Sequence, residues 1–251
     1  MTAPPRAGRG PHAAPYTSAD GRHRLYVGDS HRLPDVSSGS VGVIVTSPPY
    51  WQKGRGLASA DRWARELAVD FGREWLRVLR PEGDLWLVIG DRHDGREWAG
   101  MDGLVTAWLR RSGWALQAKG CWAQTRSRDR WDDRINYVLR FRRAGRPARR
   151  SATTLAWMLP LPRGHRDSAW DATPDEVVRA AIGESARRGA VLDPFAGAGT
   201  VGLVAAAMRR DWIGVELDPK MAALAARRLR LRRLPDALKR GTSGRERCTK
   251  K

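Results

Sequence analysis

A glycine-rich turn between a short apolar strand and a helix is the sequence feature that most restricts the fold of this chain. Residues 191–200 read VLDPFAGAGT. Without bulky side chains the backbone of such a turn can approach a ligand closely, and the helix that follows offers free N–H groups to an anionic part of it. A second strand, Trp212–Glu216, and a second helix at residues 219–231 complete a strand–helix–strand–helix unit, which is typical of parallel α/β architecture.

This unit lies within the last quarter of the chain, and its position decides the topology. Gly197, Gly199 and Gly202 spell G-x-G-x-x-G, which by itself would indicate a dinucleotide and a nicotinamide-dependent dehydrogenase. Only about fifty residues follow the turn, which is too few for a dinucleotide-binding domain. The remaining strands must come from earlier in the chain, which predicts an α/β fold with a permuted, doubly wound, Rossmann-like sheet.

The earlier chain alternates short apolar runs with helical patterns, as a mostly parallel sheet requires. We expect one domain over residues 22–235, with a disordered basic arm at 1–21 and a disordered basic tail at 236–251. The expected strands are 24–29, 41–47, 85–90, 190–192 and Trp212–Glu216, the expected helices are 61–79, 103–111, 174–188, 199–208 and 219–231, and Trp114–Gln124 with 136–142 are expected to pair as an antiparallel hairpin.

A second motif, TSPPYW at residues 46–51, directly follows an expected strand and so belongs at the carboxyl end of that strand, where open α/β sheets bind ligands. Consecutive Pro48 and Pro49 fix the backbone and leave carbonyl acceptors without local N–H donors. With the Ser47 hydroxyl, these acceptors suit a planar amino group, and Tyr50 offers a ring for stacking. The pattern indicates methyl transfer to an exocyclic amine; the alternative is an ordinary proline turn whose aromatic residues pack into the core.

The pairing of TSPPYW with the later DPFAGAGT resembles the S-adenosylmethionine-dependent DNA amino-methyltransferases of the β arrangement, in which the catalytic motif precedes the cofactor motif. The similarity runs from about residue 25 to residue 231. It implies a site-specific enzyme that methylates the exocyclic amine of a base flipped out of double-stranded DNA. It also implies that Ser47, Pro48, Pro49 and Tyr50 are the catalytic residues.

The resemblance further implies which residues hold S-adenosylmethionine. Glu216 would bind the ribose hydroxyls, and Asp29, in a Gly-Asp-Ser element, would lie near the adenine. Thr173 would be a further contact, in the segment WDATP, which departs from the family's pattern because it lacks the usual His-Pro and Phe. The residues expected around the methionine part and the sulfonium are Asp193, Phe195, Ala196, Gly197, Gly199 and Thr200.

Serine at position 47 is usual in family members that methylate cytosine at N4, whereas aspartate there favours adenine N6. We therefore expect cytosine N4, with adenine N6 of DNA as the alternative. An RNA methyltransferase and a non-catalytic nucleic-acid-binding relative also stay open. Methylation at carbon 5 of cytosine is disfavoured because it needs a nucleophilic cysteine beside the base, and Cys121 lies on an expected strand without a Pro-Cys context.

The charge of the chain favours a polyanionic partner. There are 46 Lys plus Arg against 27 Asp plus Glu, a formal net charge of +19, and each cation placed on a phosphate releases counterions. Arg outnumbers Lys 40 to 6, so the codon usage of a GC-rich genome is the alternative explanation. The expected DNA-binding residues are Trp51, Lys53 and Arg55 near the catalytic loop, and Arg126, Arg128, Arg143 and Arg146 in and before a short recognition insert at about 142–170.

The sequence also argues against several other classes. It contains no apolar run long enough for a membrane span or a secretory signal, so we expect a cytoplasmic protein. Its two cysteines lie far apart, so we expect neither a disulfide framework nor a metal site. The short recognition insert leaves room for a homodimer, and a cognate restriction enzyme would be a separate chain.

Overall fold

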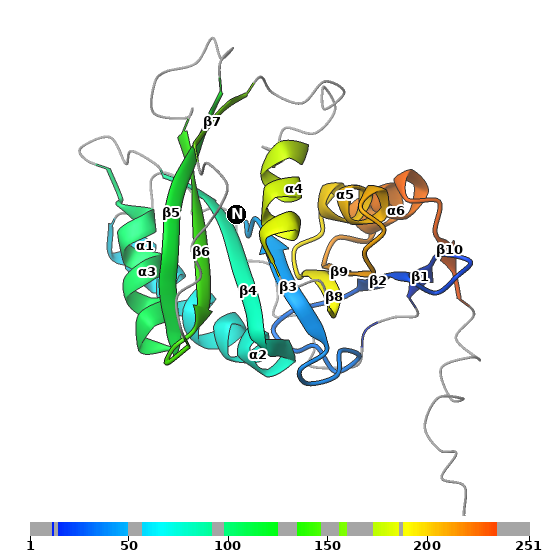
Figure 1. Ribbon diagram of the computed structural model, residues 1–251, viewed down its shortest axis with the longest axis horizontal. Coiled ribbons are helices and arrows are strands. Elements are labelled where there is room, and N and C mark those ends of the chain that lie inside the picture. Colours follow the sequence, from blue (N-terminus) through cyan, green and yellow to red (C-terminus); the bar gives the residue numbers. More distant parts are fainter. Residues whose placement is uncertain are drawn as a thin grey trace, which may run out of the picture.

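A ten-stranded sheet forms the centre of the computed structural model (Figure 1). The structure describes residues 12, 15–49, 57–91, 98–124, 135–146, 156–159, 173–185 and 188–234. The strands lie in the order β10-β1-β2-β9-β8-β3-β4-β6-β5-β7. Their bounds are β1 Tyr16–Thr17, β2 His23–Val27, β3 Val41–Thr46, β4 Leu79–Gly90, β5 Trp114–Gln124, β6 Ile135–Arg143, β7 Ala156–Leu159, β8 Ala190–Asp193, β9 Trp212–Glu216 and β10 Arg232–Arg233.

Helices cover both faces of the sheet (Figure 1). Because successive residues of a strand point to opposite faces, Ile44 of β3 contributes to one core whereas Val43 and Val45 contribute to the other. The first core includes residues of α1 to α3, and the second includes residues of α4 to α6. The helix bounds are α1 Leu57–Glu66, the π-helical turn η1 Leu67–Phe71, α2 Gly72–Val78, α3 Met101–Arg111, α4 Asp175–Glu184, α5 Thr200–Ala207 and α6 Pro219–Arg228.

The strand order reverses between β8 and β3, which are neighbours and run parallel. From β8 the chain continues through α5 to β9 on one side, whereas β3 is followed by the helices that lead to β4 on the other. Strands β2, β9, β8, β3 and β4 are parallel to one another, so their carboxyl ends lie along one edge, which we call the carboxyl edge. The permuted doubly wound sheet predicted from the sequence is confirmed, and its ligand-binding crevice belongs at the β8–β3 switch point.

The antiparallel part of the sheet also follows the prediction. Strands β5 and β6 pair antiparallel from Trp114↔Arg143 to Ala123↔Ile135, and β6 pairs antiparallel with β4. Strand β7, which was not predicted, extends this side of the sheet by pairing parallel with β5.

The first residues of the described chain are more ordered than predicted. Tyr16 and Thr17 form β1, which pairs with β2 and with β10, and His12 is buried. The prediction of a disordered arm through residue 21 is therefore wrong for residues 16–21. Its Pro- and Gly-rich composition gave no sign of strand pairs whose partners lie elsewhere in the chain.

Two boundaries in the first half also differ from prediction. The helix expected at 61–79 is interrupted by the π-helical turn η1, and β4 begins at Leu79 rather than at residue 85. Val41 pairs with Leu79 whereas Val43 pairs with Asp84, so the Arg-Pro-Glu-Gly stretch at residues 80–83 forms a bulge within the strand.

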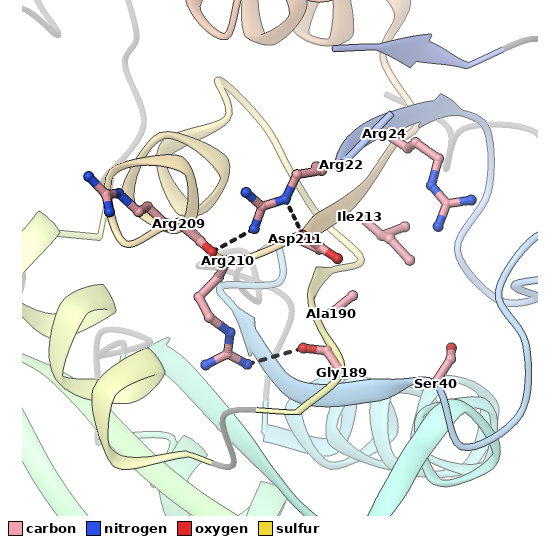
Figure 2. Close-up of a pocket in the computed structure, with 9 residues that line it drawn as sticks. All are labelled: Arg22, Arg24, Ser40, Gly189, Ala190, Arg209, Arg210, Asp211 and Ile213. Atoms are coloured by element: carbon pink, nitrogen blue, oxygen red, sulfur yellow. Dashed lines mark hydrogen bonds and ion pairs between the residues drawn. The ribbon is translucent and has the colours of Figure 1, made fainter. Parts of the chain in front are cut away.

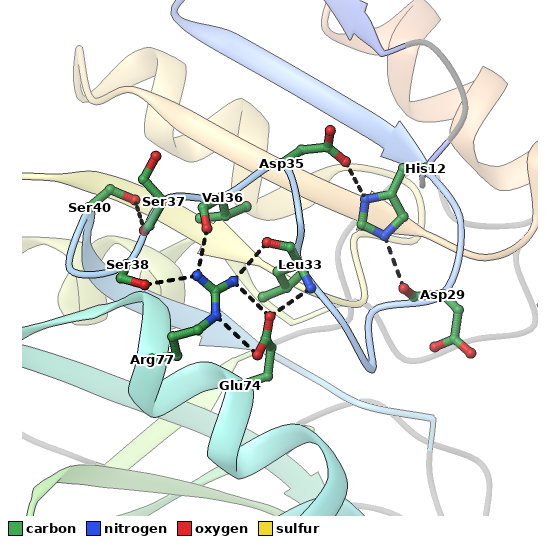
Figure 3. A network of polar contacts seen from close by, with 10 residues as sticks. All are labelled: His12, Asp29, Leu33, Asp35, Val36, Ser37, Ser38, Ser40, Glu74 and Arg77. Atoms are coloured by element: carbon green, nitrogen blue, oxygen red, sulfur yellow. Dashed lines mark hydrogen bonds and ion pairs between the residues drawn. The ribbon is translucent and has the colours of Figure 1, made fainter. Parts of the chain in front are cut away.

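The loop between β2 and β3 is held by an ion pair on α2 between the buried Glu74 and the exposed Arg77 (Figure 3). Arg77 donates to the carboxylate of Glu74, to the carbonyls of Leu33 and Val36 and to the hydroxyl of Ser38. Glu74 in turn accepts the N–H of Leu33 at 2.8 Å. These bonds give partners to the N–H of Leu33 and the carbonyl of Val36, add a second bond to the Leu33 carbonyl, which also accepts the N–H of Val36, and fix the loop against the helix.

Candidate functional site

A buried hydrogen bond joins the two strands that carry the sequence motifs. The hydroxyl of Thr46, the last residue of β3, donates to Oδ1 of Asp193, the last residue of β8, at 2.8 Å. Both side chains are buried. The bond places the Ser47-Pro48 loop and the glycine turn side by side at the carboxyl edge, so the structure brings together the two motifs that lie far apart in the sequence.

Each glycine of the turn is needed for a different structural reason. Gly197 has φ +49 and Gly199 has φ +80, backbone conformations that L side chains rarely adopt. A Cβ added to Gly199 would lie 3.0 Å from Cβ of Ala225 on α6, whereas one added to Gly197 would meet nothing closer than 4.0 Å. At Gly202 a Cβ would meet the ring of Trp212 at 3.0 Å. Gly199 and Gly202 therefore allow close packing, whereas Gly197 leaves open backbone for a ligand.

Glu216 lies where β9 ends and holds this turn. Its Oε2 accepts the N–H of Gly197 at 2.7 Å, and its Oε1 accepts the N–H of Asp218 at 2.8 Å. Its carbonyl accepts the N–H of Gly28 at the end of β2. Since a carboxylate oxygen can accept more than one hydrogen bond and Glu216 is half-buried, the side chain can also accept bonds from hydroxyl groups of a ligand.

Asp193 is the most perturbed acid of the site. Burial, with a smaller contribution from the nearby Glu216 carboxylate, raises the pKa of Asp193 to about 7, although hydrogen bonds from Thr46 and from the N–H of Phe195 oppose the rise. Neither Asp193 nor Glu216 is ion-paired to a cation within the described part of the chain. Two close acids without a cation fit a positively charged ligand. S-adenosylmethionine, with its sulfonium and its ribose hydroxyls, matches this set of groups.

The loop that carries the TSPPYW motif is described only in its first part. Ser47 is half-buried, Pro48 is buried and Pro49 is exposed, so the backbone turns outward directly after β3. The predicted residues Tyr50, Trp51, Lys53 and Arg55 lie outside the described residues.

The other predicted cofactor residues are placed as follows. Phe195 and Ala196 belong to the glycine turn, and Thr200 begins α5. Asp29 follows the end of β2 and lies at the same edge through the Gly28–Glu216 bond. Thr173 is buried just before α4, and no hydrogen bond between described residues links it to the glycine turn.

An aromatic cluster beside the turn was not predicted. The ring of Phe195 lies 5.1 Å from that of Phe71 in η1, and Phe71 lies 4.0 Å from the ring of His31 in the β2–β3 loop. Interrupted helices of this kind are frequent at functional sites, but the sequence shows only an ordinary helical pattern here. The cluster packs the glycine turn against the first half of the chain.

The structure does not bring all predicted DNA contacts to the carboxyl edge. Arg126 and Arg128 lie outside the described residues. Arg143 ends β6, which runs antiparallel to β4, and it donates to the carbonyl of Leu76; Arg146 lies near Glu82. Both arginines therefore lie at the opposite edge of the sheet. Strand direction, and not nearness in sequence to the insert, decides this edge, so these two arginines lie away from the motif residues.

A hollow of about 400 Å³ also lies at that opposite edge (Figure 2). Arg22 donates to Asp211 and to the carbonyl of Arg209, and Arg210 donates to the carbonyl of Gly189. These bonds join the starts of β2, β8 and β9. The hollow is thus separated from the motif residues by the length of the strands, about 15 Å for a strand of five residues, and it is not the predicted site.

Comparisons with known proteins point to one class. Residues 171–227 match the N6_N4_Mtase family model, described as DNA methylase. The chain is 28% identical to the Type II methyltransferase M.XycI of Xanthomonas campestris pv. cyanopsidis, over 82% of this chain and 87% of the relative. It is 27% identical to M.SmaI of Serratia marcescens, over 84% of this chain and 91% of the relative.

Solved structures share the fold. TTHA0409, a candidate DNA modification methylase of Thermus thermophilus in complex with S-adenosyl-L-methionine, aligns with a TM-score of 0.67 at 28% identity, over 82% of this chain and 93% of that one. PvuII DNA methyltransferase, which is cytosine-N4-specific, aligns with a TM-score of 0.71 at 19% identity, over 89% of this chain and 90% of that one. At 19% identity the second likeness concerns the fold alone.

The reversed strand order, the glycine turn and the acid at the end of β9 together define a Rossmann-like methyltransferase. In the order of its motifs and in the matches above, the chain is similar to the N6/N4 family of S-adenosylmethionine-dependent DNA amino-methyltransferases. The cofactor expected from the sequence, S-adenosylmethionine, is bound in the TTHA0409 structure. Among the helices in the described part of the chain, none is long and apolar enough to cross a membrane.

Proposed function

We propose that this protein transfers a methyl group from S-adenosylmethionine to N4 of a cytosine that is flipped out of double-stranded DNA. The observation that carries the proposal is the Thr46–Asp193 hydrogen bond, because it places the loop beginning with Ser47 directly beside the glycine turn. The serine at position 47 favours cytosine over adenine. The Type II methyltransferases M.XycI and M.SmaI support a role in sequence-specific DNA modification.

In this proposal the catalytic loop prepares the amine. The exocyclic nitrogen is a poor nucleophile because its lone pair is delocalised into the ring. The Ser47 hydroxyl and the Pro48 carbonyl accept hydrogen bonds from its N–H groups and so localise the lone pair on nitrogen, while Pro49 fixes the loop. Tyr50 stacks on the base, with Trp51, Lys53 and Arg55 next to the flipped strand.

The cofactor residues have a complementary role. S-adenosylmethionine supplies an electrophilic methyl group on a sulfonium. Asp193 and the turn from Phe195 to Thr200 orient the methionine part, while Glu216 accepts bonds from the ribose and Asp29 lies by the adenine, with Thr173 as a further contact. As the N–C bond forms and the C–S bond breaks, the amine becomes cationic and then loses one proton to solvent, leaving methylated base and S-adenosylhomocysteine.

The test is product identification. The protein is incubated with S-adenosylmethionine and unmethylated duplex DNA or RNA, the nucleic acid is digested to nucleosides, and the products are identified by mass spectrometry. We expect N4-methylcytosine from DNA only. N6-methyladenine would overturn the choice of base, a product from RNA alone would overturn the choice of polymer, and binding of cofactor and DNA without any product would indicate a non-catalytic relative.

Two variants separate the roles of the two motifs. Tyr50→Ala should lower the rate of methyl transfer by about 100-fold, as expected for loss of a base-positioning group, while the Kd for S-adenosylhomocysteine stays within twofold of wild type. Glu216→Ala should raise that Kd by about tenfold or more, since it removes charge-assisted hydrogen bonds. Equal loss of cofactor affinity in both variants would contradict the assignment.

A further inference from the structure

His12 is a buried side chain that precedes the sheet by several residues yet lies against the end of β2 (Figure 3). It is 5% exposed. Its Nδ1 lies 2.9 Å from Oδ2 of Asp35, and its Nε2 lies 3.0 Å from the carbonyl oxygen of Asp29. Its ring also lies 5.7 Å from that of Tyr26. The ring thus connects the two ends of the segment from the end of β2 to Asp35.

The ring occupies the space that a side chain at Gly28 would need. A Cβ built on Gly28 would lie 2.5 Å from Cδ2 of His12, and its three nearest atoms all belong to that ring. Gly28 does not have a positive φ, so its lack of a side chain is required by His12 and not by backbone conformation. The N–H of Gly28 donates to the carbonyl of Glu216 at 2.9 Å, so the turn that His12 contacts is bonded to the residue that holds the glycine turn.

Both nitrogens of the ring are engaged by this segment. The carbonyl oxygen of Asp29 can only accept a hydrogen bond, so the proton of that bond comes from Nε2. Nδ1 lies against the carboxylate of Asp35, and Tyr26 lies beside the ring. The ring cannot turn without losing both contacts.

We infer that His12 is a positioning residue of the cofactor site, which fixes the Gly28–Asp29 turn at the carboxyl edge so that the turn meets the adenosine part of the cofactor. The inference rests on the proposed function, because it requires that the cofactor bind along the ends of β2 and β9. It assigns part of the N-terminal arm to the binding site. It also explains why residue 28 is a glycine.

A double-mutant cycle tests this through one number, the Kd for S-adenosylhomocysteine measured by calorimetry on the full-length protein. His12→Ala should raise this Kd by about tenfold, as expected when the two hydrogen bonds that fix the turn are lost. Gly28→Ala should raise it by a similar factor, because the added methyl displaces the ring. In the double variant the methyl meets no ring, so its Kd should equal that of His12→Ala instead of showing the product of the two effects.

His23→Ala is the matched control. His23 lies at the other end of β2 and its ring contacts the carbonyl of Arg210, so its replacement should leave the Kd within twofold of wild type. Melting temperatures are measured for all variants, and the Kd is determined well below the lowest of them. A loss of fold stability alone then does not change the measured Kd. In steady state, His12→Ala should raise the KM for S-adenosylmethionine while kcat stays unchanged.

Two kinds of failure are distinguishable. If wild type binds S-adenosylhomocysteine and His12→Ala binds it within twofold as well, or if the two single effects multiply in the double variant, the inference is wrong while the proposed function stands. If wild type does not bind S-adenosylhomocysteine at all, the proposed function fails first, and with it the inference.

Discussion

Asp193 is buried in the fold, and this burial raises its pKa to about 7. An acid with a raised folded-state pKa is protonated in the folded protein at pH values where it is ionised in the unfolded chain. The free energy of unfolding therefore falls as pH rises from about 4 to about 7, by as much as roughly 4 kcal/mol from this group alone. Above pH 7 the ionised carboxylate lowers the free energy of unfolding of the cofactor-free protein. In the proposed function the same charge attracts a cationic cofactor.

Replacing Asp193 by Asn should separate these effects. The amide oxygen can still accept from Thr46 and from the N–H of Phe195, but no charge is buried. We expect the melting temperature of Asp193→Asn at pH 8 to equal or exceed that of wild type without cofactor, with the difference vanishing near pH 4. A lower melting temperature at pH 8 would mean that the carboxylate is not a destabilising group.

The same residue predicts how cofactor affinity depends on pH. Since the positive sulfonium favours the ionised carboxylate, the Kd of wild type for S-adenosylmethionine should fall between pH 6 and pH 8 and then level off. In Asp193→Asn the Kd should be higher and insensitive to pH in this range. Calorimetric titrations at four pH values check both; an equal pH dependence in the two proteins would assign the titration to another group.

Sequence reasoning succeeded for residues whose role is set by the backbone and failed for those set by distant partners. That Asp193, Gly197 and Glu216 share an edge follows from strand direction alone. The Thr46–Asp193 bond was not predictable, because it depends on the register of β3 against β8. His12 gave no signal at all, since its environment is made by residues 28 to 35. The sequence also did not show that Arg143, predicted to bind DNA, lies at the edge opposite the two motifs.

Among the elements, the β2–β3 loop shows most clearly how packing completes what local sequence leaves open. Besides the bonds within the loop, Arg77 and Glu74 on α2 bond to the backbone of Leu33 and Val36. Burial works against ionisation of Glu74, but the hydrogen bonds from Arg77 and from the N–H of Leu33 prevail and lower the pKa of Glu74. Such an acid stabilises the fold above its unfolded-state pKa, and this contribution is lost as pH falls.

Arg77→Lys should therefore be costly although it keeps the charge. A lysine cannot reproduce the planar set of donors that Arg77 offers, so we expect a loss of about 2 kcal/mol in the free energy of unfolding, measured by urea denaturation at pH 7. The loss should shrink at low pH, where Glu74 is protonated.

Arg62→Lys is the matched control, because Arg62 pairs with Glu66 on the exposed face of α1 and such pairs contribute about 0.5 kcal/mol or less. Equal losses in the two variants would show that the β2–β3 loop does not depend on Arg77.

The element boundaries show where local sequence patterns fail to predict the structure. The 3.6-residue periodicity predicted one helix across 61–79, but the π-helical turn shifts its phase so that Phe71 reaches Phe195. The Arg-Pro-Glu-Gly stretch is a helix breaker by composition, yet pairing with β3 incorporates it in β4. In both cases a tertiary partner overrides the local preference.

For the whole molecule, the net charge of +19 makes a quantitative prediction. If these charges serve DNA binding through roughly six to ten phosphate contacts, the affinity for a short duplex should fall about 10³- to 10⁵-fold between 50 and 200 mM salt. Fluorescence anisotropy with a labelled duplex measures this. The Kd for S-adenosylhomocysteine should change little over the same range, and a flat response for DNA as well would mean that the arginine content reflects codon usage.

The pairing of β1 with β10 has a consequence for how such proteins can be encoded. Tyr16 lies opposite Arg233, and the N–H of Leu234 donates to the carbonyl of Pro15 at 3.1 Å, so the polypeptide path from residue 15 to residue 234 is nearly a closed ring. In such a ring, the order of the two halves in the sequence depends only on where the chain begins and ends. The crevice between β3 and β8 is the same for either order. A gene rewritten to start before α4 and to finish after β7, with a short peptide joining the old ends, would specify the same catalytic architecture with its motifs in reverse order.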